Sequence, residues 1–198
     1  MITSNIKAIT KGLSDLDKEQ IPFAISKALN DTAFQAKDAL VAQMKQKLDN
    51  PTPFTLRAVR IKKATKHRQY AYVYINDTQA EYLDNMYFGG VKTPKKKAIV
   101  VPTKDIRLNK HGNLTKNKVK NLLKSPNYFS GVVKGKGGTR SGIFRRYKNG
   151  TVKQVIIWKT SKQEKKRLEF RKTIAGVVGN RFDDNFNKAL EFAIRTAR

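Results

Sequence analysis

The clearest structural signals in this chain lie in residues 81–113, EYLDNMYFGGVKTPKKKAIVVPTKDIRLNKHGN. Apolar side chains recur at helical spacing in its first residues, and Gly89 follows them, where glycine easily takes the left-handed conformation that ends a helix. The apolar residues of this predicted helix are Tyr82, Leu83, Met86 and Tyr87. The run Ala98–Val101 lies between a lysine-rich loop and Pro102, which predicts a buried strand. The stretch is therefore expected to form a compact helix–turn–strand unit.

A long amphipathic helix is predicted upstream, over residues 20–49, because its apolar residues follow the 3.6-residue period. Pro22 falls in the first turn, where the missing N–H group costs nothing. Residues 50–53 contain two prolines, which end the helix. Residues 1–18 precede the helix as a lead-in segment, and residues 55–76 follow it as a predicted β-hairpin.

The second strand of this hairpin alternates tyrosines with apolar residues, so the two kinds of side chain are expected on opposite faces. The tyrosines are Tyr70, Tyr72 and Tyr74. Tyrosines interleaved with basic residues can stack on nucleic-acid bases. The same row can also form the outer face of a strand that packs under a loop or a partner. The sequence leaves both interpretations open.

The second half of the chain predicts a short helix, three strands and a closing helix. Thr115 is the expected N-cap of the short helix, and Ser125-Pro126 ends it. Three β-branched or aromatic runs follow, and Lys148-Asn149-Gly150 connects the last two with a strong hairpin signal. The predicted strands are residues 128–133, 142–147 and 152–158. The helical period returns over residues 172–198.

These elements predict a single α+β domain over residues 1–198, in which long N-terminal and C-terminal helices pack on a mainly antiparallel β-sheet. Residues 78–160 form the helix–strand middle of this domain and carry basic loops. A chain of 198 residues with 39% hydrophobic content can bury one sizeable core. The N-terminus lacks the apolar core of a signal peptide, and no apolar run could span a bilayer, so we expect a soluble protein without membrane contact.

The charge is strongly positive and is concentrated in the middle of the chain. The sequence contains 42 Lys and Arg against 15 Asp and Glu, a formal net charge of +27. Between Val91 and Lys172 there are 25 basic residues and three acidic ones, a net charge of +22. A surface with this much positive charge indicates an anionic partner. Double-stranded DNA is the first candidate, and an acidic protein surface is the second.

The residue types offer little for catalysis or for binding a metal or a cofactor. The chain has no Cys and two His, which excludes disulfides and thiolate chemistry. The glycine-rich loop of residues 134–140 lacks P-loop spacing, and Asp183 and Asp184 point about 100° apart on a helix. No zinc-finger or RNA-recognition spacing is present. We therefore expect no enzyme, no catalytic residue, no cofactor and no metal site.

Several short motifs follow one another along nearly the whole chain. Within residues 81–114 they are Tyr82-Leu83, Phe88-Gly89-Gly90, Pro94 with basic residues, Ala98-Ile99-Val100-Val101-Pro102 and Gly112-Asn113-Leu114. Upstream they are Ile21-Pro22, Ala28-Leu29-Asn30 and Phe54-Thr55-Leu56-Arg57. Downstream they are Ser141-Gly142-Ile143, Arg145, Arg167-Leu168, Phe170 and the segment Phe182–Arg198. In this order the motifs resemble the minor tail protein Z family of tailed bacteriophages and prophages.

The resemblance implies a structural virion protein, a tail-completion or neck protein that takes part in viral assembly by joining the phage tail to the filled head. It implies a homo-oligomeric ring, a hexamer if it follows the symmetry of the tail, built in the host bacterial cytoplasm. The implied partners are further copies and neighbouring tail-tube, terminator or connector proteins, and packaged double-stranded DNA is a further candidate for contact. The alternative from composition alone is a stand-alone DNA- or RNA-binding protein without sequence specificity.

Two groups of residues are the candidate contact surfaces. The predicted partner-docking group is Tyr82, Leu83, Tyr87, Phe88, Gly89, Gly90 and Pro94. The predicted basic contact surface is Lys95, Lys96, Lys97, Lys134, Lys136, Arg140, Arg145 and Arg146. The first group combines apolar side chains with a glycine turn, and the second can meet DNA or an acidic protein.

Overall fold

The computed structural model describes residues 19–95, 97–135 and 137–196. Their contacts group them into two compact units, where the sequence predicts one domain. Unit 1 contains the described residues of 1–47, 53–82 and 168–198, and unit 2 contains those of 48–52 and 83–167. The predicted lead-in, residues 1–18, lies outside the described part of the chain.

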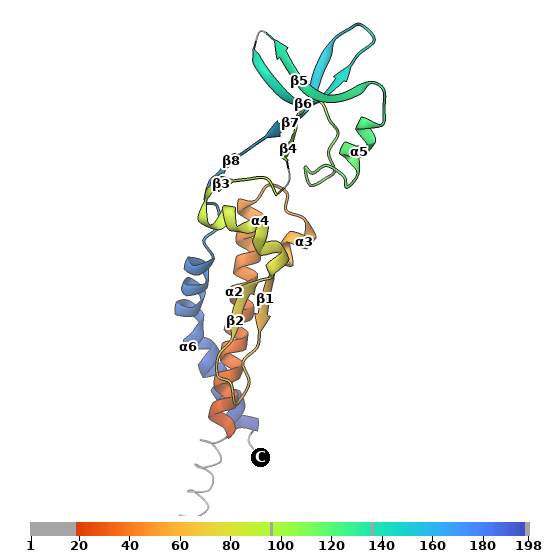
Figure 1. The fold of residues 1–198 in the computed structure, drawn as a ribbon. Helices are drawn as coiled ribbons and strands as arrows, with labels where there is room; N and C mark the ends of the chain where they lie inside the picture. Colours follow the sequence, from red (N-terminus) through yellow and green to blue (C-terminus); the bar gives the residue numbers. More distant parts are fainter. Residues whose placement is uncertain (1–18, 96, 136, 197–198) are drawn as a thin grey trace, which may run out of the picture. The chain divides into compact units, whose positions relative to one another are not determined.

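The predicted α+β class is confirmed. The described chain contains a long N-terminal helix, α2 (Ile21–Lys47), and a long C-terminal helix, α6 (Phe170–Thr196) (Figure 1). Both lie close to the predicted ranges 20–49 and 172–198, of which residues 197–198 are outside the described chain. All strand pairs are antiparallel, and the described strands form three sheets with the orders β1-β2, β3-β8 and β4-β7-β6-β5.

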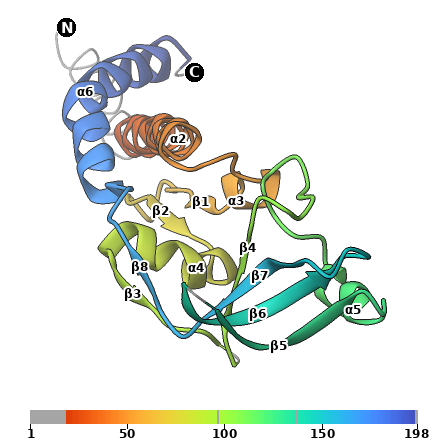
Figure 2. The ribbon, with the colours of Figure 1, turned by 90° about the horizontal axis from the view of Figure 1, so that it is seen from above.

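Unit 1 is built around α2, which packs against α6 on one side and against a two-stranded ribbon on the other (Figure 2). The ribbon consists of β1 (Val59–Lys62) and β2 (Tyr72–Ile75), and a short helix, α3 (Pro53–Leu56), precedes it. Alanines line the contact between α2 and α6, so the two helices can approach closely. These alanines are Ala24, Ala28, Ala189 and Ala193, each at most 1% exposed.

Polar side chains add directional contacts to the pairing of α2 with α6. The buried Asn185 amide donates to Thr32 Oγ1 at 2.9 Å and to Gln35 Oε1 at 3.1 Å. Nearer the start of α6, Gln43 Nε2 donates to Thr173 Oγ1 at 2.7 Å. Because each bond requires one axial position of the two helices, these contacts define their register.

Unit 2 contains a four-stranded sheet with its own apolar core. Its strands are β4 (Ile99–Pro102), β5 (Tyr128–Gly135), β6 (Gly138–Arg146) and β7 (Val152–Lys159). A second, two-stranded sheet pairs β3 (Gly90–Lys92) with β8 (Lys162–Glu164), and α5 (Lys118–Leu123) supplies one core residue. The buried core residues are Ile106, Leu122, Ile143, Val155 and Ile156.

One predicted helix end is confirmed and one predicted cap is wrong. α4 (Asp77–Phe88) ends before Gly89, which has a φ of +76° and donates its N–H to the Asn85 carbonyl at 3.0 Å. The short helix α5 begins at Lys118 instead of directly after Thr115, because Asn117 takes the N-cap position. Asparagine is as suitable an N-cap residue as threonine, so residue type alone could not choose between the two positions, and Asn117 makes no side-chain capping bond.

The strands of unit 2 also differ in part from the prediction. The expected buried strand is β4, but it lies at one end of the four-stranded order and its Val100 is 40% exposed. The predicted loop of residues 134–140 belongs largely to the β5–β6 ladder, which continues to the pair Gly135 and Gly138. Gly138 has a φ of +95°, a conformation that glycine adopts without strain, so the strands can turn within a very short connection.

Candidate functional site

The predicted docking group divides into buried and exposed side chains. Leu83 is 2% exposed, whereas Phe88 is 72% exposed. Tyr82 belongs to unit 1, where its hydroxyl donates to Thr55 Oγ1 at 3.1 Å. Tyr87 is half-buried, and its ring packs edge-on against that of Phe88 with the centroids 4.5 Å apart. Leu83 and Tyr82 therefore stabilise the fold, while Phe88 presents an apolar ring to solvent.

A glycine turn leads the chain from Phe88 into β3. Gly89 and Gly90 have φ angles of +76° and +109°, which residues other than glycine rarely adopt. Val91 follows the turn and is 59% exposed. We refer to residues 88–91 as the Phe88 turn, a short segment with two exposed apolar side chains. Pro94, the last member of the predicted docking group, is half-buried.

Lys97, one of the lysines after Pro94, lines a groove in unit 2. Lys95 and Lys97 are exposed, and Lys96 lies outside the described residues. The groove has a volume of about 660 Å³ and is lined by Lys97, Ala98, Val100, Ser130, Ser141, Trp158, Lys159 and Thr160. The Trp158 indole N–H donates to Ser130 Oγ at 3.4 Å. A groove lined by an indole and two lysines suits a group that is both flat and anionic.

Arg145 belongs to a cluster of rings and cations. Its guanidinium carbon lies 4.6 Å from the centroid of the Tyr147 ring and 5.8 Å from that of Tyr128. Lys153, which pairs with Arg145 across β6 and β7, places Nζ 5.7 Å from the Tyr147 ring. We refer to Tyr128, Arg145, Tyr147 and Lys153 as the Tyr147 cluster. Contact with a ring face orients each cation without neutralising its charge, so the charge remains available to an anion.

The predicted basic surface does not form a single face of the sheet. Arg145 and Arg146 are neighbours on β6, and neighbours on a strand point to opposite faces. Accordingly, the Arg146 guanidinium lies over the Phe129 ring, 5.4 Å from its centroid, away from the Tyr147 cluster. Lys134 and Arg140 are exposed near the tip of the β5–β6 hairpin, and Lys136 lies outside the described residues.

Most of the positive charge of the sequence belongs to unit 2. Its ranges contain 23 Lys and Arg against four Asp and Glu, a net charge of +19, which leaves +8 for unit 1. Two of these four acids form ion pairs, Asp49 with Arg167 at 3.0 Å and Glu164 with Lys162 at 2.7 Å. The remaining cations greatly outnumber the acids, so unit 2 should attract polyanions. The range of this attraction decreases as the salt concentration rises.

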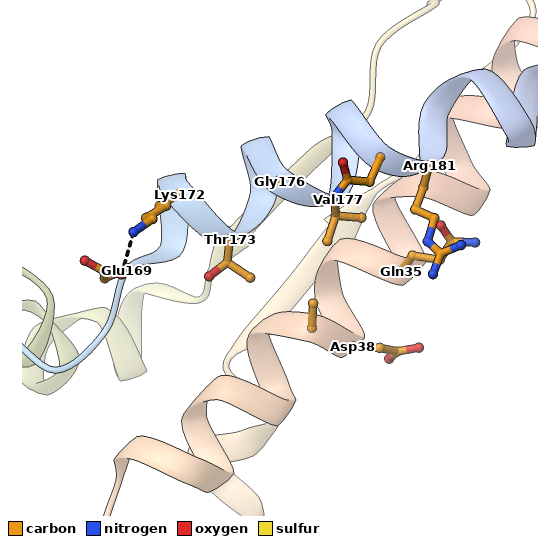
Figure 3. A pocket seen from close by; sticks show the side chains of 10 residues that line it. Gln35, Asp38, Glu169, Lys172, Thr173, Gly176, Val177 and Arg181 are labelled. Carbon is orange, nitrogen blue, oxygen red and sulfur yellow. Dashed lines mark ion pairs between the residues drawn. The ribbon is translucent and has the colours of Figure 1, made fainter.

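Unit 1 also has a groove, of about 890 Å³, between α2 and the first turns of α6 (Figure 3). Glu169 forms an ion pair with Lys172 at 3.9 Å, and Figure 3 shows Asp38 well separated from Glu169. These carboxylates do not form the close pair that acid–base chemistry would use. Asp183 and Asp184 are exposed, and among the described residues no cluster of His, Cys, Asp and Glu could hold a metal ion.

Sequence reasoning missed Trp158, Tyr147 and Lys153 as candidate site residues. Aromatic residues near basic ones are a detectable signal, but the strand register decides which of them meet. The Tyr147 N–H donates to the Thr151 carbonyl at 2.8 Å, so three residues form the turn. A two-residue turn formed by Asn149 and Gly150 would have placed Arg146, and not Arg145, opposite Lys153.

Comparisons with models of known protein families, with curated proteins and with solved structures found no match. The described helices include none that is long and apolar enough to cross a membrane. The family resemblance therefore rests on the order of the sequence motifs, and the candidate site rests on the Phe88 turn and the cationic surface of unit 2.

Proposed function

We propose that this chain is a structural protein of a tailed-bacteriophage virion, a tail-completion or neck protein at the head-proximal end of the tail. It helps to join the tail to the filled head as a homo-oligomeric ring and acts without catalysis. The order of the sequence motifs supports the family. The exposed Phe88 turn, in a unit whose ranges carry a net charge of +19, supports a docking role.

The exposure of Phe88 is the observation that carries this proposal. A phenylalanine that is 72% exposed gains free energy when a partner covers it, at about 25 cal/mol for each Å² of apolar surface removed from water. Val91, on the other side of the glycine turn, is a second exposed apolar side chain. Tail-tube, terminator or connector proteins are the proposed partners for this turn, and the cations of unit 2 meet an acidic protein rim or packaged DNA.

The mass of the purified protein, measured alone and after mixing with isolated phage tails, tests the proposal. Ring formation or stable capture on tail ends is the expected result, and a matched duplex-DNA sample is the control. A monomer that ignores tails but binds DNA would contradict the neck assignment.

Reversal of Lys95, Lys96 and Lys97 to Glu tests the basic part of the surface. We expect the variant to join heads to tails poorly while its circular dichroism spectrum stays unchanged, since Lys95 and Lys97 are exposed. Normal yields of infectious particles would remove this loop from the mechanism.

The Tyr147 cluster favours a second candidate function, DNA or RNA binding by a stand-alone protein without sequence specificity. Such a protein would bind naked duplex at low salt and lose it steeply as the salt concentration rises. A neck protein would require its ring or its neighbours for the same interaction, so the requirement for partners separates the two functions.

A further inference from the structure

The β1–β2 ribbon of unit 1 has one buried face and one aromatic, cationic face. In the antiparallel register Val59 pairs with Ile75, and Val59 is 1% exposed. The alternate positions project to the opposite face, where Tyr72 and Tyr74 are 54% and 49% exposed. Tyr70, just before β2, is 50% exposed. The three tyrosines therefore form a row on the outer face of the ribbon.

Basic side chains accompany each tyrosine of this row. Lys62 is the cross-strand partner of Tyr72, and Arg60 is the partner of Tyr74. The Arg68 guanidinium carbon lies 5.6 Å from the centroid of the Tyr70 ring. Residues 59–75 contain five Lys and Arg and no Asp or Glu. We refer to Arg60, Lys62, Arg68, Tyr70, Tyr72 and Tyr74 as the tyrosine ladder.

The spacing of the ladder suits a single nucleic-acid strand. Tyr72 and Tyr74 lie on one face of β2, where side chains recur about 6.6 to 6.8 Å apart, and the Tyr70 ring packs edge-on against that of Tyr72 with the centroids 5.2 Å apart. Consecutive bases of an extended single strand can each meet an aromatic ring at such a spacing, while the phosphates meet adjacent cations. A duplex keeps its base faces stacked inside, so the rings would have nothing to stack on. We propose that the tyrosine ladder binds single-stranded nucleic acid through base stacking on the tyrosines and phosphate contacts from Arg60 and Lys62.

Other occupants fit this face less well. A second copy of the ladder would bring cations against cations, which is repulsive. An acidic peptide would satisfy the cations but would leave the row of rings without stacking partners. The ladder lies in unit 1, so the proposal is independent of the cationic sheet of unit 2 and goes beyond the neck function.

Fluorescence anisotropy with two labelled strands of equal length tests the proposal. One strand is oligo(dT), and the other has the same phosphates but abasic sugars, so it carries the charge without the rings. We expect the full chain to bind oligo(dT) more tightly than the abasic strand. Tyr72→Ala with Tyr74→Ala should weaken oligo(dT) binding by about tenfold or more for each base that can no longer stack, with little effect on the abasic strand.

Two sets of control variants separate stacking from charge. Tyr72→Phe with Tyr74→Phe keeps the rings and should keep the preference for oligo(dT), and it also keeps the packing if the alanine variant unfolds. Arg145→Gln with Lys153→Gln in unit 2 should change binding of both strands by the same factor. Capture on phage tails is measured on all variants, so loss of strand binding can be distinguished from loss of the neck function.

Equal affinity of the unmodified chain for oligo(dT) and for the abasic strand would overturn the proposal. So would a folded Tyr72→Ala, Tyr74→Ala variant with unchanged oligo(dT) affinity. Self-association that the alanine variant abolishes, with no strand binding, would identify a second copy as the occupant instead.

Discussion

Gly142 illustrates how a single residue can control the packing of the unit 2 sheet. It pairs with Gly131 on β5 and with Ile157 on β7. A Cβ atom at Gly142 would lie 1.9 Å from the Ile156 carbonyl oxygen and 2.7 Å from Gln154 Nε2. The strands can therefore approach as they do only with glycine at this position.

Gly142→Ala is predicted to destabilise unit 2 by about 1 to 3 kcal/mol, because the backbone of β7 must move away. Gly131→Ala is the matched control, since its Cβ would meet no atom within 4 Å. Urea unfolding followed by the fluorescence of Trp158, the only Trp in the chain, measures both variants. Equal stability of the two alanine variants would contradict the packing argument.

The predicted docking group contains two residues with opposite roles, Leu83 and Phe88. Leu83→Ala should cost about 2 to 5 kcal/mol of stability, because truncating a buried side chain leaves a cavity. Phe88→Ala should change stability by less than about 0.5 kcal/mol and should reduce capture on phage tails. Thermal unfolding and tail binding of the two variants separate these effects. A Phe88→Ala variant with normal tail capture would exclude this ring from the interface.

At the scale of elements, the pairing of α2 with α6 depends on small residues. Four alanines are almost completely buried in this contact, and rings flank them. The Phe182 and Phe186 rings, one turn apart on α6, are nearly parallel, with an angle of 16° between them. Alanine lets the two helices pack closely, which leaves no space for a longer side chain. The buried Asn185 amide adds a polar contact that also requires a short distance between the helices.

Ala28→Leu is therefore predicted to destabilise unit 1 by about 1 to 3 kcal/mol through overpacking. Ala175→Leu, at an exposed position of α6, is the matched control and should change stability by less than about 0.5 kcal/mol. Far-UV circular dichroism during urea unfolding reports on both helices. If the two leucine variants unfold at the same urea concentration, the α2–α6 contact is not as tightly packed as the structure indicates.

At the scale of the whole molecule, charge is divided unequally between the two units, with +19 in unit 2 and +8 in unit 1. Phosphate contacts with duplex DNA should therefore come mainly from unit 2. Replacing Arg145 with Gln should reduce the slope of log affinity against log salt by about one, as expected for one phosphate contact. The same substitution at Lys45, an exposed residue of α2, should leave the slope unchanged. Equal slopes for both variants would contradict a localised DNA surface.

The sequence by itself determined the features that depend on neighbouring residues. Helical periodicity predicted α2 and α6 within a few residues, and Gly89 predicted the end of α4, because a local backbone conformation has a local cause. The α+β class followed from these elements. The concentration of charge in the middle of the chain was also available from the sequence alone.

Only the tertiary structure decided which of the predicted site residues are accessible and which of them meet. Leu83 and Phe88 are both apolar and lie on the same helix, yet Leu83 is 2% exposed and Phe88 is 72% exposed. Arg145 and Arg146 point to opposite faces of β6, and the register of β6 with β7 decides that Arg145 is the one that meets Lys153. Burial and register depend on long-range packing, so local sequence patterns could not specify the candidate surface.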